Sequence, residues 1–249
     1  MKLIPRCSPG ASVTPLPNGW RLEIPPGETP TYRFAQLDDY TGLSRKRFPA
    51  HPPLTLKMRA RASGNSLPGT WGFGLWNDPF GMSLGFGGNP FHLPTLPNTS
   101  WFFHASRENW LSFSEHPGNG FLAQVFASPT IPSPLLALSA IPFLPLLVTK
   151  KTRRWIRNLT HRLIVEDGIC LNLDVTQWHE YRLEWSTGRS IFSVDEGIIL
   201  NSTVSPAPPL GLVFWLDNQY AAFTPEGKLG FGVLHNQAAW LEIEDLELK

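Results

Sequence analysis

Short runs of alternating apolar and polar residues, each stopped by turn residues, recur along the chain and constrain its fold most strongly. Residues 20–24 end at Pro25, and residues 54–61 alternate without interruption before Ser63. A period of two is typical of β-strands with one face in solvent. The chain also contains 25 prolines and 21 glycines, which would interrupt long helices, so a mainly helical protein is excluded.

Two segments, 72–76 and 99–106, are apolar or aromatic on both parities, which predicts central strands covered on both faces. Further strands are expected at 120–126, 163–165 paired with 169–173, 179–185, 190–194, 210–216, 228–234 and 240–248. About a dozen strands joined by short turns indicate an all-β sandwich of two antiparallel sheets. The length of 249 residues suits one such domain over residues 1–249.

Charge and cysteine content exclude several classes of protein. The 21 basic and 20 acidic residues give a net charge of +1, so no nucleic-acid partner is expected. The two cysteines, Cys7 and Cys170, have no neighbours at metal-ligand spacing, which excludes a disulfide scaffold and a zinc finger. The first residues lack the apolar stretch of a secretory signal, so we expect a cytoplasmic protein.

The segment 129–162 differs from the rest of the chain. Residues 128–149 are almost uncharged and contain five prolines, and residues 150–162 then carry six cations. The prolines interrupt the apolar part too often for a membrane-spanning helix, and two short helices, roughly 134–141 and 146–160, are predicted as an insertion between strands.

The insertion has five open interpretations: a helix with a solvated face, a lid over a ligand groove, an anchor on an acidic inner membrane surface, an oligomer interface, or a contact of its cationic part with nucleic acid. The residues that would form the membrane interface are Leu135, Leu138, Phe143, Leu146, Lys150, Lys151, Arg153, Arg154 and Arg157.

Residues 176–185 read T-Q-W-H-E-Y-R-L-E-W, and residues 191–197 read I-F-S-V-D-E-G. This resembles the laminarinase and lichenase type of glycoside hydrolase, in which a "W-H-x-Y-x-x-x-W" strand is followed by an "F-x-V-D-G" hairpin. Residues 69–76 are similar to that family's "G-x-W-P-A-F-W" strand, and residues 240–248 to its closing strand. The resemblance covers roughly residues 54–249. It implies a concanavalin A-like jelly roll whose curved sheet forms a concave ligand groove.

The catalytic signature of that family has no counterpart. The family carries its two catalytic carboxylates on one strand as "E-x-D-x-x-E", and the corresponding residues 100–106 contain no carboxylate. Hydrolysis by paired carboxylates about 5–5.5 Å apart is therefore not expected. Whether another reaction is catalysed stays open.

Alternation along the strand predicted at residues 99–106 would place His104 in the groove and Trp101 in the core between the sheets. Amides and carboxylates bond sugar hydroxyls, and an indole stacks on the apolar face of a sugar ring. The predicted ligand-binding residues are Asn77, Asp78, His104, Ser106, Gln124, Trp215 and Asp217. The alternative is that His104 only fixes neighbouring strands, that Trp215 belongs to the core, and that Asp217 belongs to a turn.

The sequence favours non-catalytic binding of a carbohydrate or glycoconjugate, such as a glycolipid, in the concave groove. The alternative is an enzyme acting on a hydrophobic or lipid-linked substrate beneath the 129–162 insertion, and a third reading is an interaction module without a small ligand. No cofactor is expected. A structural calcium, which some relatives of this fold hold, would find only Glu23 and Glu244 here, fewer ligands than the ion takes.

Overall fold

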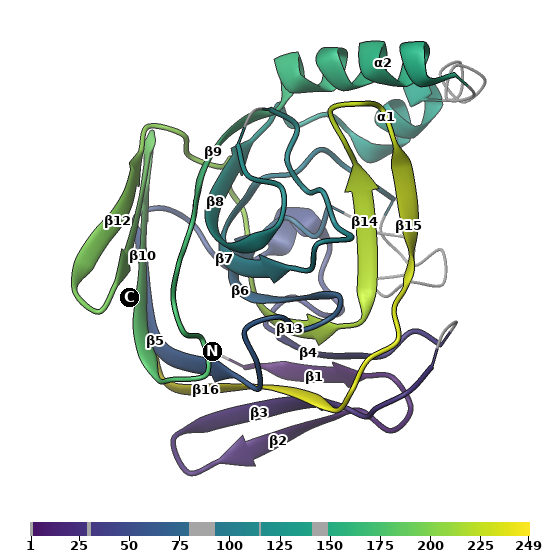
Figure 1. The fold of residues 1–249 in the computed structure, drawn as a ribbon. Helices are drawn as coiled ribbons and strands as arrows, with labels where there is room; N and C mark the ends of the chain where they lie inside the picture. Colours follow the sequence, from purple (N-terminus) through teal and green to yellow (C-terminus); the bar gives the residue numbers. More distant parts are fainter. Residues whose placement is uncertain (1, 29–30, 80–92, 115, 141–148) are drawn as a thin grey trace.

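The structure is a computed structural model that describes residues 2–28, 31–79, 93–114, 116–140 and 149–249, without the side chains of residues 137, 139 and 140. Two seven-stranded antiparallel sheets pack face to face, and two helices and a two-stranded hairpin lie at one side (Figure 1). The all-β prediction and the two-sheet sandwich are confirmed. Two residues of the predicted interface, Phe143 and Leu146, lie outside the described residues.

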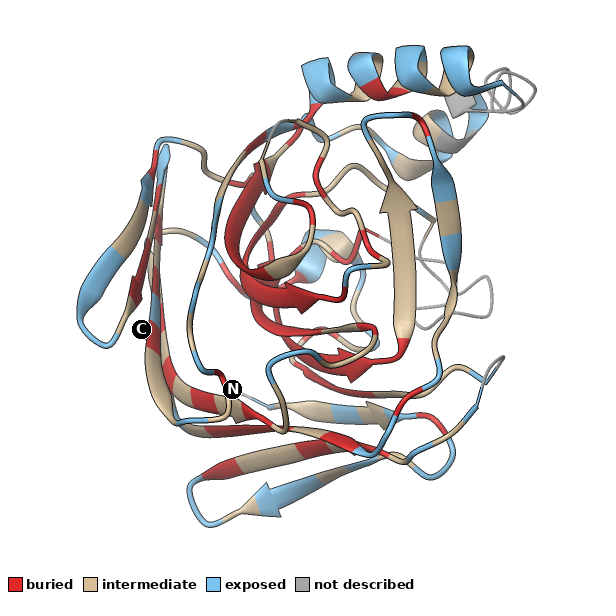
Figure 2. Ribbon diagram, in the orientation of Figure 1, coloured by how far each residue is buried: buried red, intermediate tan, exposed pale blue. Residues whose placement is uncertain are grey.

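The first sheet, sheet A, has the strand order β1-β4-β13-β6-β7-β8-β9. Its strands are β1 (Ile4–Cys7), β4 (Phe34–Asp38), β13 (Gly211–Asp217), β6 (Thr70–Trp76), β7 (Thr99–Ala105), β8 (Gly120–Ala127) and β9 (Val165–Cys170). The predicted central strands, β6 and β7, lie in the middle of this sheet and are buried on both faces (Figure 2).

The second sheet, sheet B, has the order β12-β11-β10-β5-β16-β3-β2. Its strands are β12 (Gly197–Ser202), β11 (Arg189–Val194), β10 (His179–Ser186), β5 (Leu54–Ala62), β16 (Ala239–Leu248), β3 (Gly19–Ile24) and β2 (Ser12–Leu16). Strands β14 (Gln219–Phe223) and β15 (Leu229–Val233) form the separate hairpin, and η1 (Arg45–Arg47) is a short 3₁₀ turn.

The aromatic core between the sheets decides which way β7 faces. Phe102 stacks edge-on against Tyr181 and Phe192 of sheet B, with ring centroids 5.1 and 5.2 Å apart. Directly paired residues share a face of a sheet, and Phe102 pairs with Phe73, which also lies in this core. The predicted facing is therefore wrong: Trp101 lies on the opposite, concave face of sheet A.

The predicted hairpin at 163–173 is also wrong, because one continuous strand, β9, pairs with β8 over this region. Asp167-Gly168 suggests a turn, but Gly168 lies opposite Gln124, where an added Cβ would come 3.0 Å from the Gln124 side chain. The glycine is thus needed for close packing rather than for a turn.

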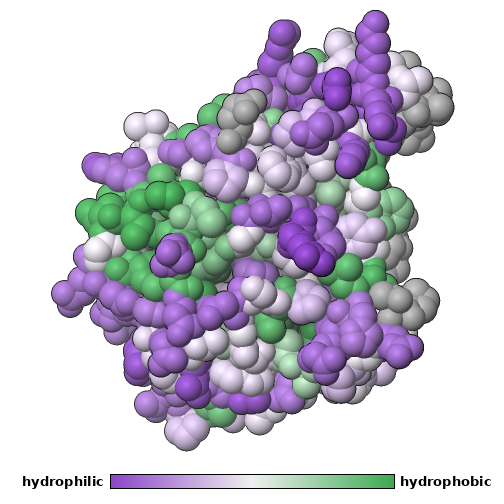
Figure 3. Space-filling model, in the orientation of Figure 1, coloured by the Kyte–Doolittle hydropathy of each residue, from purple (hydrophilic) through white to green (hydrophobic). Residues whose placement is uncertain are grey.

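The insertion contains the two predicted helices, α1 (Ser133–Ala140) and α2 (Lys150–Leu163). Thr149 caps α2 by accepting a hydrogen bond from the Thr152 amide at 3.2 Å. The outward side of α2 is hydrophilic (Figure 3). No helix in the described part of the chain is long and apolar enough to span a membrane.

Candidate functional site

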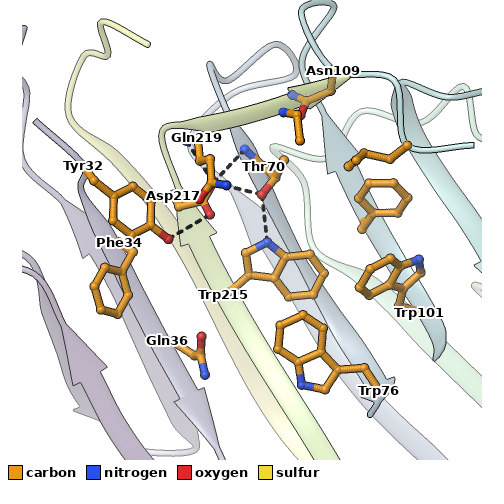
Figure 4. A pocket seen from close by; sticks show the side chains of 13 residues that line it. Tyr32, Phe34, Gln36, Thr70, Trp76, Trp101, Asn109, Trp215, Asp217 and Gln219 are labelled. Atoms are coloured by element: carbon orange, nitrogen blue, oxygen red, sulfur yellow. Dashed lines mark hydrogen bonds between the residues drawn. The ribbon is translucent and has the colours of Figure 1, made fainter. Parts of the chain in front are cut away.

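Three tryptophans from adjacent strands form an aromatic cluster on the concave face of sheet A (Figure 4). The rings of Trp215 and Trp76 are parallel, with an interplanar angle of 4° and centroids 5.9 Å apart. Trp101 completes the cluster, 5.3 Å from Trp215 and 6.0 Å from Trp76. These separations fall within the range of favourable aromatic pairs.

Two glycines on β6 make this arrangement sterically feasible. A Cβ on Gly72 would lie 2.8 Å from the Trp215 ring, and a Cβ on Gly74 would lie 2.6 Å from the Trp101 Cα. Both distances are too short for real contacts, so a larger residue at either position would displace the indoles. Because glycine alternates with Trp71 and Phe73 on β6, this part of the strand carries large side chains on the core face and none on the concave face.

A cavity of about 120 Å³ lies over this cluster. An enclosed cavity of about 150 Å³ holds benzene, and this slightly smaller pocket is open to solvent on one side, so it can take part or all of one six-membered ring while the rest of a ligand lies outside. Its thirteen lining residues come from β4, β13, β6, β7, β14 and the chain around them: Tyr32, Phe34, Gln36, Thr70, Trp76, Trp101, Phe103, Asn109, Leu111, Trp215, Asp217, Gln219 and Ala221.

A chain of hydrogen bonds fixes one edge of this pocket. The Trp215 indole donates to the Thr70 hydroxyl at 3.0 Å, and that hydroxyl donates to Asp217 Oδ1 at 2.9 Å. Asp217 Oδ1 also accepts from the Thr70 and Gln219 amides, and Oδ2 accepts from the Tyr32 hydroxyl at 3.2 Å. Burial raises the pKa of Asp217 to about 6, although these donors act in the opposite direction.

Gln36 supplies a polar group between the aromatic residues of the pocket. Its amide nitrogen donates to Asp38 Oδ2 at 2.8 Å and to the Tyr40 hydroxyl at 3.2 Å. These bonds orient the amide so that its oxygen points toward the Asp217 end of the pocket (Figure 4). The oxygen is therefore positioned to accept a hydrogen bond from a ligand hydroxyl.

Residues 106–114 and 116–119, which we call the cover, lie over the β8 side of the concave face, where Phe113 packs against Phe126. Trp110 forms backbone hydrogen bonds with Ala221 and Phe223 of β14, at 2.9 and 3.3 Å. The Asn109 side chain accepts from the Ala221 amide at 2.9 Å. Leu111, also in the cover, lines the cavity, so the cover forms one wall of the pocket.

Arg157 of α2 holds the cover in place. Only 5% of this residue is exposed, and its guanidinium donates to the carbonyls of Ser112, Ser114 and Phe223 at 2.6–3.1 Å. The prediction that Arg157 faces a membrane is therefore wrong, because a carbonyl cage inside the protein surrounds its charge. Glu166 of β9 secures the same segment by accepting from the Ser112 hydroxyl and from the Phe113 and Ser114 amides.

The structure separates the predicted ligand residues into four groups. Trp215 and Asp217 line the aromatic pocket. The Asn77 side chain forms hydrogen bonds with the backbone of residues 96 and 98. The backbone carbonyls of Asn77 and Asp78 accept hydrogen bonds from Arg45. This pair therefore organises a turn and does not line the aromatic pocket.

Gln124, by contrast, lies on the concave face opposite Trp101 in the β7–β8 pair and outside the pocket lining. Both polar atoms of its side chain are buried without a hydrogen-bond partner among the described residues, as is the Trp101 indole nitrogen.

His104 and Ser106 line a different cleft, of about 1,030 Å³, at one end of the sandwich. His104 stacks on Trp71 with ring centroids 5.7 Å apart, on the core side of sheet A. Burial lowers the pKa of His104 to about 4, so its imidazole is neutral near pH 7. It packs against Trp71 on the side of sheet A opposite the predicted concave face, and its Nδ1 has no hydrogen-bond partner among the described residues.

The described residues include no group of three or more His, Cys, Asp or Glu side chains arranged to hold a metal. Glu23 and Glu244, considered for calcium, instead contact Arg21 at 3.0 Å and Arg59 at 3.9 Å on sheet B.

The sequence analysis missed most of the pocket: Tyr32, Phe34, Gln36, Thr70, Trp76, Trp101 and Gln219 among others. One feature of the sequence could have indicated the pocket: Gly72 and Gly74 mark the face of β6 against which large aromatic rings lie. Directly paired positions on β7 then include Trp101 and Phe103.

A scan against protein families finds no match for this sequence, and a search of curated proteins finds none either. Solved structures do resemble it. A legume lectin-like domain from Entamoeba histolytica has a TM-score of 0.50 at 10% identity, covering 99% of this chain and 89% of that domain. A glycoside hydrolase family 16 endo-glucanase from Bacteroides ovatus has a TM-score of 0.52 at 8% identity, covering 99% and 94%. The chain therefore has the concanavalin A-like fold that lectins and glucanases share.

Proposed function

We propose that the protein binds a carbohydrate, without hydrolysing it, in the aromatic pocket on the concave face of sheet A. The observation that carries the proposal is the cluster of Trp76, Trp101 and Trp215 beneath a ring-sized cavity with polar groups along its edge. The apolar face of a sugar ring packs on such a surface, while its hydroxyls need polar partners at the rim.

The rim offers those partners on the side of β4 and β14. The amide oxygen of Gln36 can accept a hydrogen bond from a ligand, and among the described residues the one donor to Asp217 Oδ2 is the Tyr32 hydroxyl. A carboxylate oxygen has two acceptor positions, so Oδ2 has room for a ligand hydroxyl. Gln219 lines the pocket nearby.

The same pocket argues against hydrolysis by a carboxylate pair. Asp217 is the one carboxylate among the thirteen residues that line it. Its Oδ1 already accepts three protein hydrogen bonds, so the group is held as a structural acceptor. The two-carboxylate mechanism needs a second such group across the glycosidic bond.

The structural neighbours add support at the level of the fold. The Bacteroides ovatus endo-glucanase was solved in complex with an oligosaccharide derivative, and a second family 16 protein from that organism, with a TM-score of 0.51 at 9% identity, with an oligosaccharide product. The fold is therefore compatible with a carbohydrate site in those proteins.

A glycan array probed with the purified protein tests the proposal. We expect binding to a restricted set of glycans, and we expect Trp215→Ala to remove it. Trp178→Ala is the matched control, because Trp178 lies on sheet B against Arg59 and Arg61. Equal binding by Trp215→Ala and the wild type would contradict the proposal, and so would an array without any bound glycan.

A second proposal concerns the membrane surface, and the exposed apolar side chains of the two helices support it. Leu135 and Leu138 on α1 are 58% and 65% exposed, and Trp155 on α2 is 53% exposed. Lys150, Lys151 and Arg154 are exposed too, which suits acidic lipid at the cytoplasmic face of a membrane.

Sedimentation with vesicles separates the membrane proposal from a solvated helix. We expect binding to phosphatidylserine-containing vesicles at low salt and release at high salt, as the cations are screened. No sedimentation with acidic vesicles at low salt would overturn it.

A further inference from the structure

The concave face of sheet A is not an open groove in this protein. Phe113 of the cover packs against Phe126 of β8, with ring centroids 6.2 Å apart, and Leu111 belongs to the same apolar cluster. The cavity lies beside the cover, over β4, β13, β6 and β7.

The cover is built as a fixed wall. Glu166 and Arg157, both less than a tenth exposed, bond its backbone from β9 and from α2. Detaching the cover would take two carbonyl acceptors, of Ser112 and Ser114, from the buried Arg157 guanidinium and three donors from the buried Glu166 carboxylate, which is energetically costly. Hydrogen bonds from Trp110 and Asn109 to β14 join the cover to the hairpin, so two walls of the pocket form one continuous structure.

The order of the lining strands gives the direction of entry, because β4 lies across β13 and β6 from β7 and the cover. Tyr32 and Phe34, stacked 5.2 Å apart, lie at the β4 side and are half-buried, as Leu111 and Gln219 also are. Trp101 and Phe103, which lie on β7 next to the cover, are 4% and 0% exposed. A ligand that enters past Tyr32 therefore reaches the indoles and meets Leu111 at the end of its path.

We infer that this pocket recognises the terminal residue of a glycan, with the rest of the chain leaving past Tyr32 and Phe34. The inference rests on the proposed carbohydrate binding and names its ligand more narrowly: one ring at a chain end, not an internal stretch. The small volume of about 120 Å³ and the fixed wall beside it are the two observations that support this.

The test measures how affinity depends on chain length. Intrinsic tryptophan fluorescence or calorimetry would be used with methyl glycosides of glucose, galactose, mannose and N-acetylglucosamine, and with di- to hexasaccharides that end in each. We expect the Kd of the best methyl glycoside to lie within threefold of its tetrasaccharide. A tenfold or greater gain from one residue to four would overturn terminal recognition while leaving carbohydrate binding intact.

Capping the two chain ends provides an independent arm. The best tetrasaccharide would be compared with one form O-methylated on its non-reducing terminal residue and another reduced to the alditol at the opposite end. Loss of binding with either modification supports the inference and identifies the end, whereas full binding by both overturns it. If the wild type binds no glycoside or oligosaccharide, the proposed function and this inference both fall.

Discussion

The two halves of the concave face of sheet A are both aromatic, but one half is covered by protein and the other lies below a cavity. Over β8 and β9, Phe126 is covered by Phe113, and Arg157 and Glu166 bond the backbone of the cover. Over β13 and β6, Trp215 and Trp76 lie below a cavity. The comparison shows that an aromatic concave surface is by itself no evidence of a ligand site, because one half of this surface serves packing alone.

The covered half should be the more sensitive to loss of a single charge. Arg157→Ala leaves three carbonyls without their donor, and we expect it to lower the free energy of unfolding by about 3–5 kcal/mol. Urea unfolding measures this. Arg162→Ala on the same helix is the control, since Arg162 is exposed and should change stability by less than about 0.5 kcal/mol. Equal effects of the two variants would show that the cover is not held through α2.

The open half should respond to pH through Asp217. Its folded pKa of about 6 exceeds its unfolded value of about 4, so the stability it contributes is present below pH 4 and lost as pH rises through 6. Asparagine can keep the three bonds to Oδ1, and its amide can donate to the Tyr32 oxygen. We therefore expect the stability difference between Asp217→Asn and the wild type to grow in favour of the variant by about 2 kcal/mol between pH 4 and pH 7.5.

The comparison must be made between the two proteins at each pH, because other groups titrate in the same interval. His104, with its pKa lowered to about 4, adds stability as pH rises, and Asp39, whose pKa burial raises to about 6, loses it. Both are present in wild type and variant. A pH-independent difference would show that Asp217 is ionised normally in the folded protein.

Ligand binding should distinguish the halves directly. Trp215→Ala is expected to weaken glycan binding by about 2 kcal/mol or more, roughly 30-fold, because one aromatic anchor often carries that much. Phe113→Ala in the covered half should lower stability and leave the Kd within about threefold. Circular dichroism at the assay temperature shows that both variants are folded. The reverse pattern would place the ligand under the cover.

The smallest effect is expected at the boundary between the halves, where Gln124 is buried without a hydrogen-bond partner among the described residues. Gln124→Leu removes an unsatisfied amide of similar volume, so we expect it to raise the free energy of unfolding by about 1 kcal/mol. Glycan binding should be unchanged, since Gln124 does not line the pocket. Weaker glycan binding by this variant would show that Gln124 belongs to the ligand site.

Alternation in the sequence was enough to predict the strands of sheet B that have one solvated face, such as β5 and β16. It did not reveal β1 or β2, because Pro5 and Pro15 interrupt them, and proline is tolerated here only because both are edge strands. It also could not orient β7, since residues of both parities are large and apolar and only the pairing with β6 distinguishes them. For the same reason, alternation in the sequence did not identify most of the residues that line the pocket.

Trp215 and Asp217 were found because they share one parity of a single strand. Gln36 and Tyr32 were not, because they lie about 180 residues earlier and reach the pocket only through the pairing of β4 with β13. The sequence thus predicted residues of one strand together, whereas the site depends on neighbours set by sheet topology.

A crystal structure of the protein with its tightest-binding glycoside tests the central claim most directly. The account predicts one sugar ring over Trp215, with hydroxyls toward Gln36 and Asp217 and the aglycone pointing past Tyr32. A sugar bound in the end cleft beside His104, or on sheet B against Trp178 and Trp240, would contradict it.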